Sequence, residues 1–215
     1  MRCLLCGCEM QQGSLRDILF NEDIICEACR SKWERKKIDF RLDGIRVRSD
    51  YVYNDAFSEC LIQYKACCDE ALKDVFLYRI KDVIRKRYKG YTVCLMPSST
   101  TKRAVRGFNH LAGMYESLGI KMIEPFEKVE EKDQKGAGRV ERRNMEHGIR
   151  LKPDVQLPKK ILLCDDTITT GSTLKGALRV LDHNSHRIEI YCVSANHLWI
   201  QEKKKLFHFP YIQKW

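Results

Sequence analysis

The sequence contains no long apolar run. No segment approaches the ~18–20 consecutive apolar residues that a membrane-spanning helix needs, which excludes an integral membrane protein. The N-terminal segment Met1–Cys6 lacks the apolar region of a secretory signal peptide, so we expect no export and a cytoplasmic location. Internal repeats and low-complexity tracts are also absent. With 44% hydrophobic and 32% charged residues, the 215-residue chain can form a soluble core, and its length suits one full domain plus a small module.

Acidic residues are outnumbered by basic ones. The formal net charge of +10 favours polyanionic partners such as nucleic acids or phosphorylated metabolites. Surplus lysine also keeps proteins soluble, so the charge by itself does not distinguish a bound polyanion from simple solubility.

Cysteine, by contrast, is abundant. An odd total of 11 cysteines in a chain without an export signal argues against a disulfide framework and favours metal ligation and buried thiols. Five of these cysteines lie within the first 29 residues. The others occur mostly among apolar residues and are predicted to be inert core positions, namely Cys60, Cys67, Cys68, Cys94, Cys164 and Cys192.

Two Cys-x-x-Cys pairs near the N-terminus predict a zinc site. Cys3 and Cys6 form the first pair, and Cys26 and Cys29 form the second. Each two-residue spacer can fold into a tight turn that points both sulfurs at one cation, and four thiolates leave no open coordination position. The predicted zinc is therefore structural, with redox pairs or free thiols as the alternatives. Cys8 could replace one ligand, but the pairing of the other four argues against it.

The remainder of the chain alternates between strand and helix patterns. Strands are predicted at residues 45–53, 91–96, 160–164 and 188–193, and helices at residues 57–64, 71–87, 105–118 and 173–181. The basic segment Arg30–Asp43 is interpreted as a connector, and the charged segment Lys128–His147 as a long loop. Alternation of this kind predicts an α/β fold with a parallel sheet.

The segment from Ile161 to Thr173 carries the clearest chemical signal. An apolar strand delivers Asp165 and Asp166, and a hydroxyl-rich loop with one glycine then leads directly into a helix. Backbone N–H groups of such a loop and of the helix N-terminus can bind a phosphate. The two carboxylates can accept hydrogen bonds from ribose hydroxyls and help to position a magnesium-bound ligand. A pair of aspartates that only caps a helix is the alternative.

This segment resembles the phosphoribosyl pyrophosphate motif of type I phosphoribosyltransferases. The resemblance implies a doubly wound parallel sheet with the ligand at the carboxyl ends of its strands. It also implies that Asp165 and Asp166 form the catalytic, ribose-binding pair. The 5′-phosphate would be held by Thr167, Thr169, Thr170, Gly171, Ser172 and Thr173.

Further motifs make the chain similar to the ComF family of competence F-like phosphoribosyltransferases. They are, in order, the four-cysteine ribbon, Tyr64-Lys65, Pro97 followed by Arg106-Gly107-Phe108-Asn109, the loop residues Gln134, Arg142 and Asn144, and the phosphoribosyl motif. The chain departs from the family at His110, where glutamine is usual, and at Lys102, where arginine is frequent. This resemblance divides the chain into a zinc ribbon with its connector (1–43), a phosphoribosyltransferase-like domain (44–200) and a basic aromatic tail (201–215).

The strand end at Pro97–Lys102 falls where such folds place the pyrophosphate loop. Ser98, Ser99 and Lys102 suit a diphosphate, although hydroxyl-rich turns are also common in loops without a ligand. Arg106 could add a second cation, and Asn109 could orient the substrate or simply cap a helix. The 128–147 loop could close over the pyrophosphate as a lid, or it could be an exposed run of charge.

Two functions follow from the resemblance. The first is a protein of natural transformation whose domain binds phosphoribosyl pyrophosphate with magnesium. It would handle single-stranded DNA, beside an uptake helicase of the ComF operon type. The second is a metabolic phosphoribosyltransferase with an unidentified nitrogenous acceptor, whose chemistry would need positioning and electrostatics but no protein nucleophile. A zinc-ribbon scaffold with a vestigial ligand loop is a third interpretation. Lysines and aromatic residues in the tail 203–215 could contact unpaired bases or could dock on the core.

Overall fold

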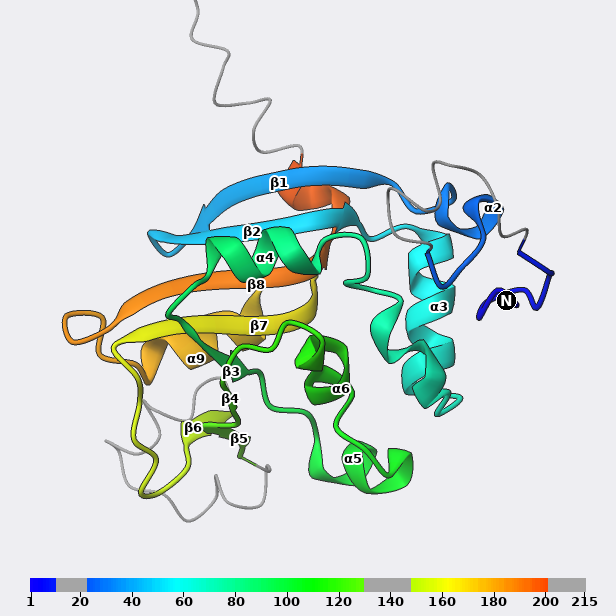
Figure 1. Cartoon of the computed structure of the whole chain (residues 1–215). Coiled ribbons are helices and arrows are strands. Elements are labelled where there is room, and N and C mark those ends of the chain that lie inside the picture. The colour runs from blue at the N-terminus through cyan, green and yellow to red at the C-terminus, as the bar shows by residue number, and fades with distance from the viewer. Residues whose placement is uncertain (11–22, 130–147, 201–215) are drawn as a thin grey trace, which may run out of the picture.

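The computed structural model describes residues 1–10, 23–129 and 148–200 (Figure 1). The predicted lid loop therefore lies outside the described residues except for Lys128 and Val129, and so do its three motif residues, Gln134, Arg142 and Asn144. The predicted tail at 201–215 lies outside them as well.

A six-stranded sheet organises the described chain. Its strand order is β1-β2-β8-β7-β3-β4, and only the β1–β2 pair is antiparallel. The strands are β1 (Arg35–Leu42), β2 (Ile45–Val52), β3 (Thr92–Leu95), β4 (Met122–Ile123), β7 (Lys160–Ile168) and β8 (Arg187–Ala195). A separate antiparallel pair joins β5 (Phe126–Lys128) to β6 (Ile149–Leu151). The predicted α/β class with a mostly parallel sheet is confirmed.

Strand β1 occupies the segment that the sequence predicts to be a connector. Asp43 and Gly44 have φ values of 49° and 81°, which is the backbone of a two-residue hairpin turn, and Leu42 pairs with Ile45 across it. The first three residues of β1 are exposed and basic. An edge strand needs to bury only one face, so charged residues are tolerated in it. These basic residues interrupt the apolar alternation by which a strand is recognised in a sequence.

Seven short helices, besides a helical turn at residues 197–200, accompany the sheet among the described residues. They are α2 (Glu27–Arg30), α3 (Asp55–Lys65), the 3₁₀ helix η1 (Glu70–Asp74), α4 (Lys81–Arg87), α5 (Thr100–Arg106), α6 (His110–Glu116) and α9 (Ser172–Arg179). In Figure 1, α4 lies on the near face of the sheet and α9 on the far face. None of these helices has both the length and the apolar character that crossing a bilayer requires.

Two predicted helices are each divided into two elements. The one expected at residues 105–118 breaks at Gly107, whose φ of 81° ends α5, and α6 begins after Asn109, whose side chain accepts from backbone N–H groups of the first turn. The helix expected at residues 71–87 becomes η1, a turn and α4. Its apolar residues from Leu72 to Ile80 are buried on more than one side, which a single amphipathic helix does not allow.

The thiols outside the N-terminal cluster fall into two groups. Four of the six predicted core cysteines are buried, namely Cys60, Cys94, Cys164 and Cys192. Cys67 and Cys68 are exposed just after the end of α3, so their prediction as core residues is wrong. The apolar residues that precede Cys67 and Cys68 in the sequence belong to α3, whereas the two cysteines lie in the turn after it.

The course of the chain places a crevice at the ends of β3 and β7. These strands are neighbours, but the chain leaves β3 for β4 on one side and leaves β7 for β8 on the other. Connections that diverge in this way leave the carboxyl ends of both strands uncovered, and α/β proteins bind ligands there.

Candidate functional site

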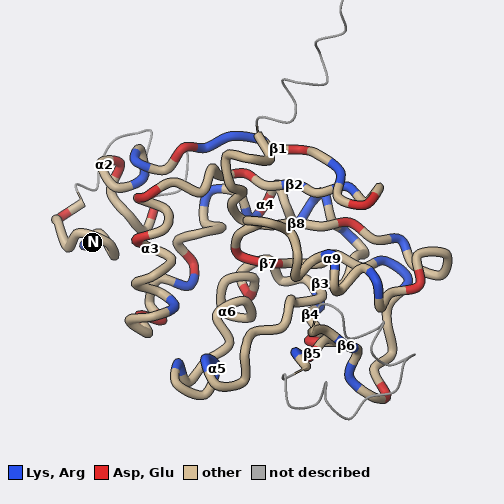
Figure 2. The backbone as a smooth tube through the Cα atoms, turned by 180° about the vertical axis from the view of Figure 1, so that it is seen from behind, with Lys and Arg blue, Asp and Glu red and all other residues tan. Residues whose placement is uncertain are grey.

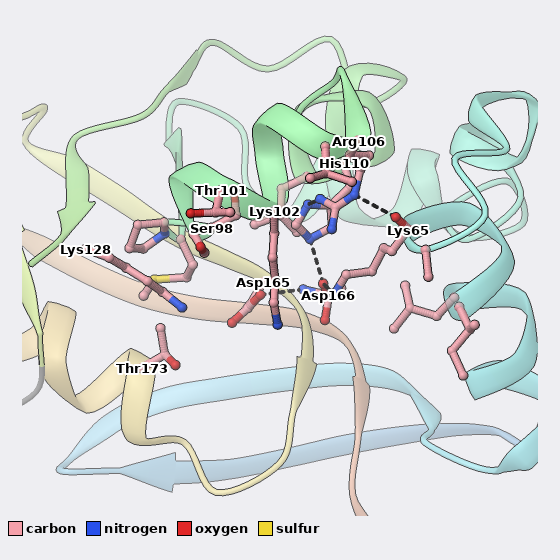
Figure 3. A pocket seen from close by; sticks show the side chains of 18 of the residues that line it. Lys65, Ser98, Thr101, Lys102, Arg106, His110, Lys128, Asp165, Asp166 and Thr173 are labelled. Atoms are coloured by element: carbon pink, nitrogen blue, oxygen red, sulfur yellow. Dashed lines mark hydrogen bonds and ion pairs between the residues drawn. The ribbon is translucent and has the colours of Figure 1, made fainter. Parts of the chain in front are cut away.

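A pocket of about 720 Å³ opens at the carboxyl ends of β3 and β7 (Figure 3). Its walls come from the end of α3, the segment after β3 with α5, the start of α6, and Lys128 of β5. Seven of the predicted site residues line it, namely Ser98, Ser99, Lys102, Arg106, Asp165, Asp166 and Thr173. The volume lies within the ~300–1,000 Å³ typical of small-molecule sites.

Asp165 and Asp166 sit side by side in β7 but in different surroundings. Asp166 is buried, and its Oδ2 accepts from Lys65 Nζ at 2.7 Å and from His110 Nε2 at 2.8 Å. Burial alone would raise the pKa of Asp166, but the His110 hydrogen bond and the Lys65 charge outweigh it and hold that pKa at about 2. Burial and the Asp166 charge raise the pKa of Asp165 to about 7. The pKa values of the two carboxyls are thus shifted in opposite directions, which favours the ionised form at Asp166 and disfavours it at Asp165.

The loop after β7 is shaped by one glycine. Gly171 has a φ of +75°, and a Cβ there would lie 3.4 Å from atoms of Leu42 and Trp199, so a larger residue would be strained and crowded. Trp199 Nε1 also donates to the Thr169 carbonyl at 2.7 Å. Residues 167–174 line a small concavity at the start of α9. Leu42 and Trp199 therefore pack against the loop, while the concavity at the start of α9 stays open.

The hydroxyl groups of the loop are not equivalent. Thr170 and Ser172 are exposed, with their hydroxyls 3.1 Å apart. The Thr167 hydroxyl instead lies 2.8 Å from that of Ser194 on the neighbouring strand β8. The side chain of Thr167 is therefore engaged by the sheet, whereas Thr170 and Ser172 are available to a ligand.

The segment facing the loop contributes cations and hydroxyls. Figure 3 shows Lys102 and Lys128 pointing into the same space as Asp165. Arg106 is held by the protein, because its Nε donates to the Lys65 carbonyl at 2.8 Å and its Nη1 lies 2.7 Å from His110 Nδ1. Asn109 caps α6, accepting from two backbone N–H groups, and does not line the pocket. Of its two predicted roles, the capping role is the one the geometry displays.

Lys65 and His110 belong to the site although sequence reasoning assigned neither a role. Burial lowers the pKa of His110, with the Asp166 hydrogen bond acting against it and the charges of Lys65 and Arg106 adding to it. Lys65 lies 101 residues before its partner Asp166. The family motifs were the only signal that could have found it, because no local pattern links residues so far apart.

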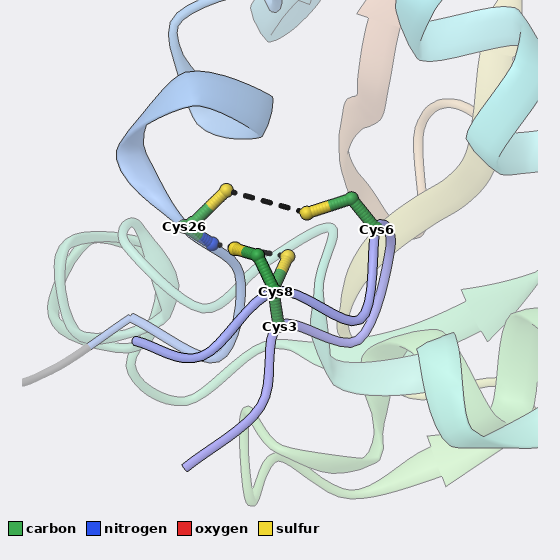
Figure 4. A group of neighbouring side chains, drawn as sticks. All are labelled: Cys3, Cys6, Cys8 and Cys26. Carbon is green, nitrogen blue, oxygen red and sulfur yellow. Dashed lines mark hydrogen bonds between the residues drawn. The ribbon is translucent and has the colours of Figure 1, made fainter. Parts of the chain in front are cut away.

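A second constellation lies at the N-terminus, where four thiols converge (Figure 4). The sulfurs of Cys3, Cys6, Cys8 and Cys26 all lie within 4.8 Å of one another. Cys6 and Cys26 are separated by 3.7 Å, which matches the roughly 3.8 Å between two sulfurs bound tetrahedrally to one zinc ion. The Cys26 N–H also points to the Cys3 sulfur at 3.2 Å, as a thiolate ligand requires. These donors fit a structural zinc ion.

Three of the four predicted ligands are in this group, and Cys8 joins them. Cys29, the fourth predicted ligand, lies outside the mutual 4.8 Å group, but its thiol interacts with those of Cys26, Cys6 and Cys3. Hydrogen bonds from the backbone and thiol of Cys8 lower the pKa of Cys6 to about 6. Two thiols therefore compete for the fourth position.

Comparison with known proteins places the chain among its relatives. Competence protein ComFC of Streptococcus pneumoniae (strain ATCC BAA-255 / R6) is 32% identical over 207 residues, covering 85% of this chain and 94% of that protein. The chain belongs to the ComF family. A second ComF-family protein, Competence protein ComFC of Bacillus subtilis (strain 168), is 26% identical over 210 residues, covering 83% and 88%. The resemblance drawn from the sequence motifs is thereby confirmed.

Two other comparisons add little to this ComF-family assignment. The crystal structure of orotate phosphoribosyltransferase from Aeropyrum pernix has 17% identity and a TM-score of 0.31, covering 82% of this chain and 94% of that chain. A TM-score of this size does not establish a shared fold. No family model matches the chain.

Proposed function

We propose that this chain binds phosphoribosyl pyrophosphate with magnesium at the ends of β3 and β7 and acts in DNA uptake. One observation carries the proposal. The acidic pair and Thr173 face a hydroxyl- and lysine-bearing segment after β3 across one pocket, and the Gly171 loop lines an adjoining concavity that also includes Asp165 and Thr173. A sugar with a phosphate at one end and a diphosphate at the other offers the complementary groups.

Different residues of the site would bind the ribose, the 5′-phosphate and the diphosphate of that ligand. Asp165 and Asp166 would accept from the ribose hydroxyls, and the loop that includes Thr170 and Ser172 would hold the 5′-phosphate. Lys102 and the hydroxyls of the segment after β3 would bind the diphosphate, whose oxygens would carry the magnesium ion. The zinc ion, in this proposal, stabilises the N-terminal module and takes no part in the chemistry.

The role in DNA uptake rests on the relatives. Both curated relatives are named competence proteins. Natural transformation brings single-stranded DNA into the cytoplasm, and we propose that this chain works there with that strand or with the uptake helicase. The net charge of +10 is compatible with either an anionic ligand or nucleic acid.

A specific feature of the pocket supports the metabolic alternative. The lining continues beyond the acidic pair into an apolar part formed by Leu61, Ile62, Met96 and Val105. Ile62 and Val105 are among the few large apolar side chains that are exposed in the described chain. An apolar wall next to the ribose position could receive a planar nitrogenous acceptor, which would make the chain a phosphoribosyltransferase.

Calorimetry with phosphoribosyl pyrophosphate and magnesium tests the binding site. Losing hydrogen bonds to charged groups costs about 1.5–3 kcal/mol, so Asp166→Asn and Thr170→Val should each weaken binding roughly ten- to a hundredfold. Asp154→Asn is the matched control. Asp154 is exposed and precedes the N-terminal end of β7, away from the pocket at the other end of the strand. Its φ of 60° is one that asparagine also tolerates. Unchanged affinity in both site variants would place the ligand elsewhere.

A second measurement separates binding from turnover. The chain is incubated with phosphoribosyl pyrophosphate, magnesium and one nitrogenous base at a time, and released pyrophosphate is measured. Release that depends on one base establishes a transferase. Binding without release for any base favours the binding role in DNA uptake.

A further inference from the structure

A network of three polar side chains that line the pocket, Lys65, Arg106 and His110, holds Asp166 of the acidic pair. Lys65 and His110 both donate to Oδ2 of Asp166, at 2.7 and 2.8 Å, and Arg106 Nη1 contacts the other ring nitrogen of His110 at 2.7 Å. His110 and Asp166 are 4% and 7% exposed. The four residues come from α3, α5, α6 and β7, so the network links three helices at the pocket to the strand that carries the acidic pair (Figure 3).

The contacts determine where the proton of His110 lies. An arginine guanidinium can only donate, so His110 Nδ1 accepts from Arg106 and carries no hydrogen. Nε2 must then carry the proton that it shares with Asp166 Oδ2. The imidazole is thus neutral and held in one tautomer. Arg106 is fixed in turn at its other end, where its Nε donates to the Lys65 carbonyl.

We propose that the Arg106–His110 pair positions Asp166 for the ribose hydroxyls, an inference that rests on the proposed function. Both protein donors use Oδ2, which fixes the carboxylate plane and leaves Oδ1 to a ligand hydroxyl. Because the imidazole is neutral, it orients Asp166 without cancelling its charge. Arg106 is therefore a positioning residue that acts through His110 and does not itself contact the diphosphate.

Two variants of His110 test this role by separating hydrogen bonding from volume. His110→Gln keeps one acceptor for Arg106 and one donor for Asp166, whereas His110→Met has a similar size and neither group. Calorimetry with phosphoribosyl pyrophosphate and magnesium should show affinity within about threefold of the original chain for H110Q, and a loss of roughly tenfold or more for H110M. Equal affinity of H110M and the original chain overturns the inference, and so does an H110Q variant as weak as H110M. Thermal unfolding of both variants checks that each is folded.

A double-mutant cycle tests whether Arg106 acts through His110. If it does, Arg106→Met should weaken binding in the original chain but have little further effect in the H110M background. Losses that multiply would mean that Arg106 contacts the ligand directly, which overturns this part of the inference. A ¹⁵N spectrum of labelled histidine provides a readout without ligand: the original chain should show His110 protonated at Nε2 only, and protonation at Nδ1 contradicts the geometry.

The outcomes separate this inference from the proposed function. An original chain that binds no phosphoribosyl pyrophosphate overturns the proposed function, and the positioning role fails with it. An original chain that binds the ligand, together with an H110M variant that binds it equally well, overturns the positioning role alone.

Discussion

At the scale of single residues, Cys29 and Cys8 are the two candidates for the fourth zinc ligand. Cys29 is half-buried and belongs to the turn that begins α2, where its N–H donates to the Cys26 carbonyl at 3.0 Å, while Cys8 is exposed. We propose that Cys29 completes the set, because a preformed turn loses less freedom when its second sulfur binds the metal. Cys29→Ser should therefore lower the zinc content below one ion per chain, because only the weaker set with Cys8 is left, and Cys8→Ser should retain one zinc ion per chain.

Elemental analysis of protein purified without chelators measures this directly. The two serine variants are matched, since each removes one thiol from the same cluster. Zinc retained in C29S but lost in C8S would assign the fourth position to Cys8. No zinc in the original chain would contradict the site as a whole.

At the residue level, the sequence shows the groups that are close along the chain. The two cysteines of each Cys-x-x-Cys pair and the run from Asp165 to Thr173 are such groups, and their roles as ligands stay predictions. Lys65 and His110 were noted only as motif positions and were given no role, because they reach Asp166 from 101 and 56 residues away. Arg106 was predicted to meet a diphosphate, and only the fold shows its guanidinium held by Lys65 and His110.

At the scale of elements, the buried ion pair of Arg30 and Asp23 joins the α2 segment to the chain after η1, through the Val75 carbonyl and Arg79. Arg30 at the end of α2 donates to Asp23 through Nε at 2.7 Å and through Nη2 at 2.8 Å, and Nη2 also reaches the Val75 carbonyl at 3.0 Å. Both charged side chains are about 5% exposed or less, at 4% for Arg30 and 5% for Asp23. Burial opposes ionisation of Asp23, but Arg30 and Arg79 outweigh it and lower its pKa.

Asp23→Asn should destabilise the protein by about 3–5 kcal/mol at pH 7, because it leaves the buried Arg30 charge uncompensated. Since the folded-state pKa of Asp23 is lowered, its stabilisation is complete above the ordinary aspartate pKa of about 4 and is lost as pH falls through the lowered value. The difference between the two proteins should therefore narrow in acid. Urea unfolding at neutral and acidic pH measures it.

Asp39→Asn is the control for that experiment. Asp39 pairs with Arg46 and Arg48 at 3.7 and 3.2 Å, but its side chain is 46% exposed, so its loss should cost about 1 kcal/mol or less. A D23N effect no larger than that of D39N, or one that does not change with pH, would contradict the proposed role of the buried pair.

Most elements could be predicted because strands and helices leave local periodicities. Two of the differences between prediction and structure show why others were not. Strand β1 was missed because a charged exposed face masks an edge strand, although Asp43-Gly44 is a hairpin signal. The break at Gly107 was missed because the apolar spacing continues across it, while the backbone turns through a positive φ.

At the scale of the whole molecule, the excess positive charge predicts weak binding of single-stranded DNA. Arg35, Lys36 and Lys37 form an exposed basic run at the start of β1, visible as the blue stretch beside that strand in Figure 2. We expect little sequence preference and a steep loss of affinity with salt, because binding to phosphates releases counterions. Fluorescence anisotropy of a labelled oligonucleotide across a salt series measures both.

Two triple variants of equal charge locate the DNA-binding surface. Replacing residues 35–37 by glutamine should make the slope of log binding constant against log salt concentration shallower by about 2. Each phosphate that the protein no longer neutralises contributes roughly 0.7 to this change. Replacing the exposed Lys86, Arg87 and Lys89 at the end of α4 is the control and should leave the slope unchanged. No binding to the original chain at low salt would mean that the +10 charge serves an anionic ligand or solubility, and that a role in DNA uptake requires a protein partner.

The sequence by itself determined the ComF-family assignment, the α/β class and the groups that a sugar phosphate would need, because these depend on contiguous motifs and local periodicity. Tertiary structure alone decided which groups share one pocket, which hydroxyls and cations are already engaged, and how Asp166 is held between Lys65 and His110. The physical reason is that burial and hydrogen-bond geometry arise where distant segments meet. A linear pattern does not record which partner a buried carboxylate will find.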